Sequence, residues 1–134
     1  MTEAPVKRKL IEVAMPIEAV NLAGRAEKAV PKKGHPATLH LWWSRKPLGI
    51  ARAVLFASLV NDPCSEGDDG RLDPEASKER QRLLDLTARL AVWDAVTDVD
   101  LMAEAARAIE GSWPDGLPGA LDPFCGGGAI PLEA

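Results

Sequence analysis

The most informative stretch of the sequence is residues 121–134, which read Leu121-Asp122-Pro123-Phe124-Cys125-Gly126-Gly127-Gly128-Ala129-Ile130-Pro131-Leu132-Glu133-Ala134. A short apolar stretch, a cluster of glycines and a second apolar run predict a strand, a tight turn and the opening turn of a helix. Consecutive glycines permit positive φ angles and a close approach of backbone to ligand. Open α/β sheets bind ligands at such turns, so we predict the α/β class.

Two familiar nucleotide-binding motifs are not satisfied by this turn. In the dinucleotide fingerprint G-x-G-x-x-G, Gly126 and Gly128 fit the first two positions, but Pro131 stands where the third glycine belongs. A phosphate-binding loop also requires Lys and Ser or Thr after its last glycine, and neither follows here. What remains of the turn as a motif is the string D-P-F-C-G-G-G.

The sequence before this turn is predicted to be mainly helical. Apolar spacing, Asp caps and Pro residues at helix starts support this prediction. The predicted helices cover residues 10–30 with an interruption at Pro16, 47–60, 74–95, and 98–111 with Asp98 as the cap. Loops are predicted at 31–36, 61–71 and 112–119, and a short extended segment at 38–43. The helix predicted after the glycines has only its opening turn before Ala134, and a helix needs several turns to offset its nucleation cost. We therefore expect the chain to be the first part of a longer protein.

Composition places the 134-residue chain among globular proteins, with 46% hydrophobic and 27% charged residues. No apolar run approaches the roughly 20 residues of a membrane helix, and no secretory signal is present, so no membrane association is expected. Cys64 and Cys125 lack metal-ligand spacing. We interpret both as reduced thiols of a cytoplasmic protein.

Charge is distributed unevenly along the chain. Residues 1–60 hold 10 Lys and Arg against 4 Asp and Glu, whereas residues 61–134 hold 6 against 16. A basic N-terminal half is suited to contact a polyanion. Solvated helix faces would explain the same distribution, so charge alone leaves both interpretations open.

A second notable segment runs from His35 to Leu48 and contains Trp42-Trp43-Ser44-Arg45-Lys46-Pro47. The tryptophans are suited either to core packing or to stacking on nucleic-acid bases. His35 and His40 have no Cys or carboxylate beside them in the sequence, so the pair is poor support for a metal site and none is predicted.

Several strings in the chain resemble a known family. They are R-K-L-I-E-V-A-x-P-x-E-A near the N-terminus, G-H-P-x-T-L-H-L-W-W-S-R-K-P-L, R-A-V-L-F-A-S-L-V, and L-D-P-F-x-G-G-G-x-I-P-L-E-A. The chain resembles the large prokaryotic adenine-specific DNA methylases, which begin with a conserved domain of unknown function and often carry a zinc ribbon further on. The resemblance covers Arg8–Val60 and Leu121–Ala134 closely and the middle of the chain loosely.

The resemblance implies a cofactor, a fold and a set of site residues. The cofactor is S-adenosylmethionine, and the D-P-F-x-G-G-G string resembles its first binding motif in amino-methylating DNA methyltransferases. The implied fold is a helical N-terminal domain over 1–118, followed at 119–134 by the first strand and glycine turn of a Rossmann-like methyltransferase sheet. The implied cofactor-binding residues are Asp122, Pro123, Phe124, Cys125, Gly126, Gly127 and Gly128 in the turn, with Ser44, Arg45 and Lys46 from the second segment.

The implied roles of individual residues follow from the chemistry of the cofactor. Asp122 would accept a hydrogen bond from the methionine amine, and Phe124 would pack near apolar parts of the ligand. Ser44, Arg45 and Lys46 are expected beside the glycine turn at the carboxyl edge of the sheet. Arg45 would hold the cofactor carboxylate in a bidentate grip, or alternatively would contact DNA phosphate.

The implied activity is methyl transfer to the exocyclic N6 amine of adenine in DNA, in which the target base leaves the helix. The base-holding string of such enzymes, [DNS]-P-P-[YFW], is absent from this sequence. We therefore expect the catalytic residues downstream of Ala134, and expect the 134 residues alone to be inactive and marginally stable. DNA is the expected partner, and RNA stays open as a substrate. The implied biological setting is restriction-modification or phage defence, in which further subunits of such a system are possible partners.

Two other classes of protein stay open on the sequence alone. One is a nucleic-acid-binding or protein-binding module without catalytic activity, which would use the basic half and the tryptophan pair. The other is a nucleotide-dependent enzyme unrelated to methylation, against which the two unsatisfied phosphate motifs count.

Overall fold

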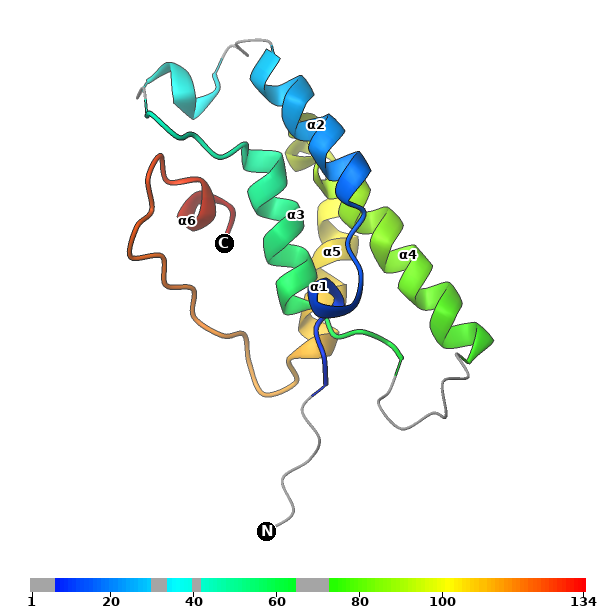
Figure 1. The fold of residues 1–134 in the computed structure, drawn as a ribbon. Helices are drawn as coiled ribbons and strands as arrows, with labels where there is room; N and C mark the ends of the chain where they lie inside the picture. Colours follow the sequence, from blue (N-terminus) through cyan, green and yellow to red (C-terminus); the bar gives the residue numbers. More distant parts are fainter. Residues whose placement is uncertain (1–6, 30–33, 40–41, 65–72) are drawn as a thin grey trace.

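A computed structural model of the chain describes residues 7–29, 34–39, 42–64 and 73–134. Helices joined by loops make up these ranges (Figure 1). The elements are α1 (Leu10–Val13), α2 (Ile17–Ala29), the 3-10 turn η1 (Pro36–Thr38), α3 (Leu48–Leu59), α4 (Pro74–Leu90), the 3-10 turn η2 (Trp93–Thr97), α5 (Val99–Ser112) and α6 (Ala129–Glu133). Among the described helices, none is both long and apolar enough to span a membrane.

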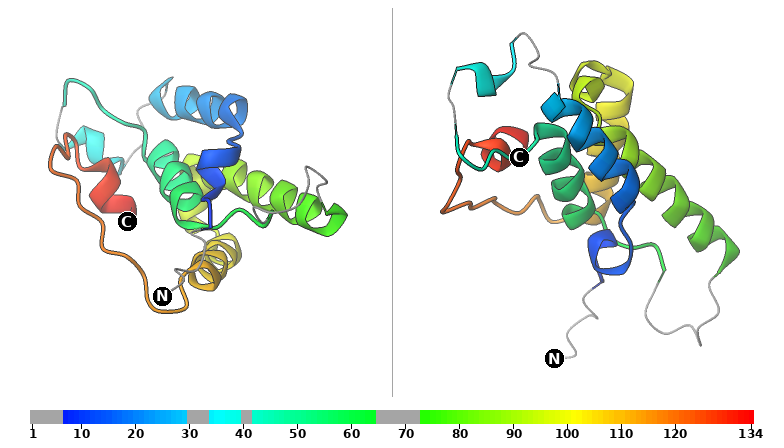
Figure 2. Two further views of the ribbon diagram at one scale, coloured as in Figure 1. Left: turned by 60° about the horizontal axis from the view of Figure 1, so that its bottom comes forward. Right: turned by 45° about the horizontal axis from the view of Figure 1, so that its top comes forward.

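Helix α3 is the central element, with α2 and α4 on one side, α5 behind it and α6 on the opposite side (Figures 1 and 2). Arg52 and Ser58 are the only residues of α3 with polar side chains, and a helix that is apolar around its circumference is normally buried. The main core lies where α3 meets α4 and α5. It consists of Leu10, Phe56, Ala57, Val60, Leu83, Leu86, Leu90, Ala95, Leu101 and Ala105.

The prediction of an α/β fold with a Rossmann-like sheet is wrong. The described residues contain no strand, and their only β pairing is an isolated antiparallel bridge between Lys9 and Asn61. Leu121, the predicted strand residue, is 91% exposed. Leu121 lies between the Pro/Gly loop and Pro123, and Pro123 has no N–H to donate. Too few residues remain between them to form a strand that could hydrogen-bond to another strand. The apolar side chains of α3 pack against the other helices and not against a sheet.

Most helices were predicted correctly from the sequence, because their boundaries are marked by capping residues and prolines. Asp73 caps α4 by accepting from the backbone N–H of Glu75, and Asp98 caps α5 by accepting from that of Leu101. The predicted helix over 10–30 is divided into α1 and α2 at residues 14–16, where Pro16 disfavours helical backbone in the residue before it.

Two predicted boundaries differ from the structure. The helix predicted to reach Ala95 ends at Leu90, and a separate 3-10 turn follows. The carbonyl oxygens of Leu90 and Val92 accept hydrogen bonds from the buried Arg52 guanidinium, which gives the end of α4 a partner in α3. The extended segment was predicted at 38–43, and within it residues 40–41 lie outside the described residues. A loop was predicted at 61–71, and within it residues 65–71 lie outside the described residues.

A buried carboxylate joins α2 to the beginning of α3. Val20, Gly24 and Glu27 form the buried stripe of α2. Glu27 accepts hydrogen bonds from the backbone N–H groups of Leu48 (2.7 Å) and Gly49 (3.0 Å). Those N–H groups have no partner within their own helix. The Glu27 carboxylate therefore does for α3 what an N-cap side chain would do, at a position where Pro47 provides none.

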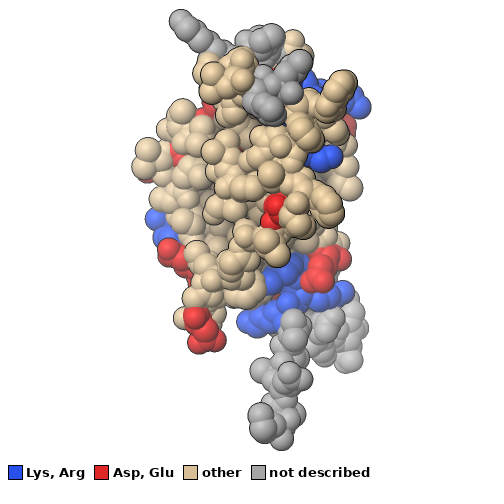
Figure 3. Space-filling view, turned by 90° about the vertical axis from the view of Figure 1, so that its left-hand side faces the viewer, with Lys and Arg blue, Asp and Glu red and all other residues tan. Residues whose placement is uncertain are grey.

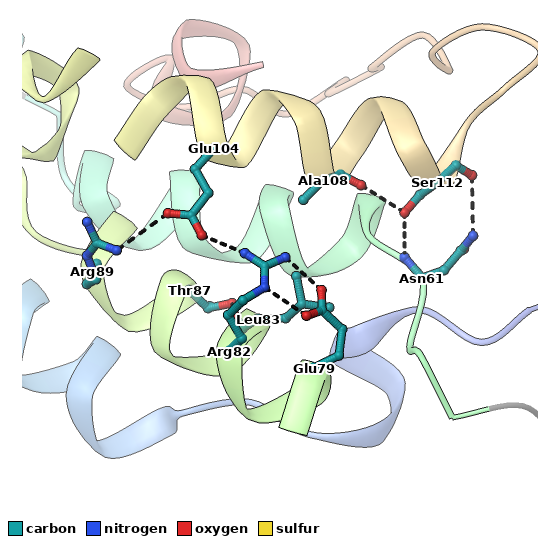
Figure 4. A network of polar contacts seen from close by, with 9 residues as sticks. All are labelled: Asn61, Glu79, Arg82, Leu83, Thr87, Arg89, Glu104, Ala108 and Ser112. Carbon is teal, nitrogen blue, oxygen red and sulfur yellow. Dashed lines mark hydrogen bonds and ion pairs between the residues drawn. The ribbon is translucent and has the colours of Figure 1, made fainter. Parts of the chain in front are cut away.

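A polar network connects α4 to α5 along one edge of the core (Figure 4). The Arg82 guanidinium donates to both carboxylate oxygens of Glu79 on its own helix and to Glu104 on α5. Arg89 lies 3.6 Å from the other oxygen of Glu104. The hydrogen bond from Arg82 is the main cause of the lowered pKa of the Glu79 carboxyl.

We predict that Glu27→Ala lowers the free energy of unfolding by about 2–4 kcal/mol, because two buried N–H groups lose their acceptor. Urea denaturation measures the loss. Glu18→Ala, at an exposed position of the same helix, is the control and should cost less than about 1 kcal/mol. Equal losses in the two variants would contradict a capping role for Glu27.

We predict that the stability contribution of Glu79 depends on pH. Its folded-state pKa lies below the usual 4.5, so its contribution is complete above that value and is lost as the pH falls further. Both Glu79 and Arg82 are about half exposed, so the contribution is under about 1 kcal/mol. Glu79→Gln should lower the melting temperature more at pH 7 than at pH 3. Glu110→Gln, exposed on α5, should show no such difference; a pH-independent effect of Glu79→Gln would contradict the prediction.

Candidate functional site

The glycine turn, which we define as residues 122–128, is the best formed candidate site of the C-terminal region. Oδ1 of Asp122 accepts a hydrogen bond from the backbone N–H of Phe124 (3.2 Å), and the N–H of Gly128 donates to the carbonyl of Cys125 (2.8 Å). Gly126 and Gly128 have φ angles of +55° and +80°. L side chains rarely adopt such angles, so the path of this turn requires glycine at both positions.

A segment distant in the sequence lies against this turn. We define the tryptophan segment as residues 42–46. A Cβ atom added to Gly126 would lie 3.0 Å from Nε1 of Trp42, and one added to Gly127 would lie 3.6 Å from Cβ of Trp42 and 4.0 Å from Cγ of Arg45. Glycine at these positions therefore allows the two segments to approach closely, and a larger residue at 126 would displace the indole.

Both segments are held in place by α3. The tryptophan segment leads directly into the N-terminus of α3, where Leu48 and Ala51 pack with Ala129 of α6. Arg52 then fixes α6 by donating to both carboxylate oxygens of Glu133, at 2.7 and 3.2 Å. Because these contacts lie on consecutive turns of one helix, the glycine turn and the tryptophan segment occupy fixed positions relative to each other.

A surface hollow of about 380 Å³ lies beside the tryptophan segment. Its lining residues are Lys28, Trp42, Trp43, Ser44 and Arg45. The indole of Trp43 is 98% exposed, and that of Trp42 is 39% exposed. The possibility that both tryptophans belong to the core is therefore wrong, since neither is buried.

The residues predicted from the sequence to bind a cofactor differ in exposure. Phe124 is 91% exposed, Cys125 is exposed, and Asp122 is partly buried. In the tryptophan segment Ser44 and Lys46 are exposed, and Arg45 is partly buried. The structure brings Arg45 to the glycine turn, but not to the edge of a sheet. That these residues bind a cofactor stays a prediction.

The buried polar residues that support this site could not be recognised as such from the sequence. Nε2–H of His35 donates to Oε1 of the Glu27 carboxylate (3.0 Å), and the His35 ring stacks on that of Trp93 with centroids 4.4 Å apart. A local signal existed for Arg52, which is the single charged residue in the apolar run of α3. No local signal identifies its partner Glu133, because 81 residues separate the two.

The described residues contain no group of three His, Cys, Asp or Glu side chains that could hold a metal ion. Cys64 and Cys125 are both free thiols. His40, one of the two histidines of the second sequence segment, lies outside the described residues.

Comparison with known proteins identifies a family. Residues 14–86 match the profile of the DUF1156 family, which is described as a protein of unknown function. The match covers more than half of the chain, so the chain belongs to this family. The matched region contains the tryptophan segment and α3, but not the glycine turn. Searches of curated proteins and of solved structures found no significant match.

We predict that Arg52→Met destabilises the protein by about 3–5 kcal/mol, because the buried Glu133 carboxylate and two carbonyl oxygens lose their donor. Chemical denaturation measures this loss, and faster amide exchange at residues 129–133 should show that α6 detaches. Arg89→Met is the control, since Arg89 is 56% exposed and should cost under about 1 kcal/mol. Unchanged exchange in α6 would contradict the anchoring role of Arg52.

Proposed function

We propose that this member of the DUF1156 family is part of an S-adenosylmethionine-dependent DNA methyltransferase that modifies the N6 amine of adenine. The observation that carries the proposal is the contact between its two motifs. The D-P-F-C-G-G-G string forms a turn with two glycines at positive φ, and Arg45 of the S-R-K-P string lies against that turn. Both strings belong to the resemblance with adenine-specific DNA methylases.

The residues of the turn fit the chemistry of this cofactor. The ligand has an amino acid end with one positive and one negative group, a ribose and an adenine, and it has no phosphate. Asp122 offers a carboxylate whose Oδ2 has no partner among the described residues. Arg45 offers a guanidinium that likewise forms no ion pair or hydrogen bond within the described part of the chain. A cation and an anion beside exposed glycine backbone match a zwitterion better than they match a polyphosphate.

Each of these residues has a defined task in the proposal. Arg45 grips the carboxylate of the amino acid end through two parallel N–H donors, which fixes the orientation of the ligand. Asp122 accepts from the ammonium group, while its other oxygen holds the turn through the N–H of Phe124. The exposed ring of Phe124 covers apolar parts of the ligand. When bound, the cofactor supplies an electrophilic methyl group on a sulfonium.

The catalytic contribution of this chain is therefore positioning. In-line attack by an amine needs both reactants held in one geometry, and well-oriented reactants can account for as much as roughly 7–11 kcal/mol of a barrier. The sequence lacks the [DNS]-P-P-[YFW] string that holds the target base in adenine-specific methylases. We propose that the full-length enzyme provides that string and that these 134 residues alone do not transfer methyl groups.

Binding of S-adenosylmethionine, measured by isothermal titration calorimetry, tests the proposal. We predict that Asp122→Asn weakens binding roughly 10- to 150-fold, because a hydrogen bond to a charged group contributes about 1.5–3 kcal/mol. Asp115→Asn, in the exposed loop before the turn, is the matched control and should bind like the wild type.

Two further outcomes are informative. Arg45→Ala should also raise the dissociation constant for S-adenosylmethionine. Equal affinity of wild type, Asp122→Asn and Arg45→Ala would refute the proposed site. A wild-type protein that binds DNA but not S-adenosylmethionine would instead favour a nucleic-acid-binding module without a cofactor.

A further inference from the structure

The indole of Trp43 is the most exposed large apolar side chain of the described residues, at 98%. Trp42 next to it lies against the glycine turn, which explains its position structurally. Trp43 has no comparable packing role. A fully exposed indole keeps a large apolar surface in contact with water. Binding of a ligand that covers this surface is favourable, because it removes the apolar surface from water.

We propose that the hollow beside Trp43 binds an unstacked nucleobase of single-stranded DNA together with its neighbouring phosphates. The choice of DNA rests on the proposed function. The ring of Trp43 provides the stacking surface, Lys28 provides a phosphate contact, and Trp42 forms the wall shared with the glycine turn.

The charge of the hollow fits a nucleic-acid backbone. Among the described residues, its lining includes Lys28 and Arg45 and no carboxylate. Neither cation forms an ion pair with any residue in the part of the chain that the structure describes. Lys46, the next residue along, is exposed and equally unpaired there. Figure 3 shows one face of the molecule, most of whose visible surface belongs neither to Lys and Arg nor to Asp and Glu. Two cations that are unpaired within the described residues, Lys28 and Arg45, therefore line the hollow together with the exposed ring.

The size and place of the hollow favour a single base over a duplex. A volume of about 380 Å³ lies at the lower end of the range for small-ligand sites, roughly 300–1,000 Å³. A base can stack on an indole only after it leaves the stack of its own helix. Methyl transfer to adenine requires the same extruded base. Since Trp42 lines the hollow and also contacts Gly126, the base site lies directly beside the proposed cofactor site.

Fluorescence anisotropy with a labelled ten-nucleotide oligo(dA) tests the inference. Trp43→Ala should weaken binding roughly 5- to 150-fold, the loss expected for one stacked base, whereas Trp43→Phe should retain most of the affinity. Lys28→Gln should reduce the slope of log affinity against log salt by about 0.7, the value for one phosphate contact on a single strand. Labelled duplex of the same length should bind more weakly than the single strand.

Two control variants match these changes. Leu22→Ala removes an exposed apolar side chain from α2 outside the hollow, and Lys78→Gln removes an exposed cation from α4. Both should bind oligo(dA) like the wild type. Because the side chain of Trp43 is almost fully exposed, Trp43→Ala should keep the wild-type circular dichroism spectrum.

The inference is overturned if folded Trp43→Ala binds oligo(dA) as tightly as the wild type, a result that would instead make Trp43 a contact for a protein partner. It is also overturned if the duplex binds more tightly than the single strand. Its failure is distinguishable from that of the proposed function. Trp43→Ala should bind S-adenosylmethionine normally, and Trp43-dependent binding of oligo(dA) without any binding of S-adenosylmethionine would support the inference while refuting the methyltransferase proposal.

Discussion

The arrangement of the chain depends on the buried carboxylate of Glu27 at the beginning of α3. A negative group at a helix N-terminus satisfies unpaired N–H groups and interacts favourably with the helix dipole. Here the carboxylate comes from α2, so the same contact that caps α3 also fixes the crossing of the two helices. Gly24 of α2 allows this crossing, because a Cβ there would clash with the side chain of Ile50 on α3.

Helix α3 also positions the two surface segments of the candidate site. Its first turn follows the tryptophan segment, and its buried Ala51 and Arg52 hold α6 and hence the glycine turn. The candidate site is thus composed of two loops: the tryptophan segment leads into α3, and the glycine turn leads into α6, which is packed on α3. Sites on rigid elements hold their geometry better than sites on loops alone, which is what positioning of a ligand requires.

Features with local causes could be predicted from the sequence, and features that need distant partners could not. The Asp73 and Asp98 caps, the break at Pro16 and the burial of α3 follow from residues within a few positions of each other. The glycine turn and its positive φ angles are similarly local. The strand before it was predicted wrongly, because a strand needs pairing partners, and residues 119–121 have none among the described residues.

The partners of Glu27 and Arg52 could likewise not be predicted from the sequence. Glu27 lies 21 residues from Leu48, and an acidic residue on a charged helix such as α2 is usually a solvated one. The contact of Trp42 with Gly126 depends on how α6 docks on α3, and no periodicity in the sequence encodes it. Arg45 could be placed beside the turn only through the resemblance of the two motifs to those of a family.

The ion pair between Arg52 and Glu133 also bears on the order in which the protein folds. It joins residues 81 positions apart, whereas Arg52 reaches the end of α4 across 38 positions. Closing a longer loop costs more chain entropy, and contacts of long sequence separation form slowly. We therefore expect α6 and the glycine turn to dock after α3 and α4 have assembled. Among the described elements, the turn that carries the candidate site would then be the last to become ordered.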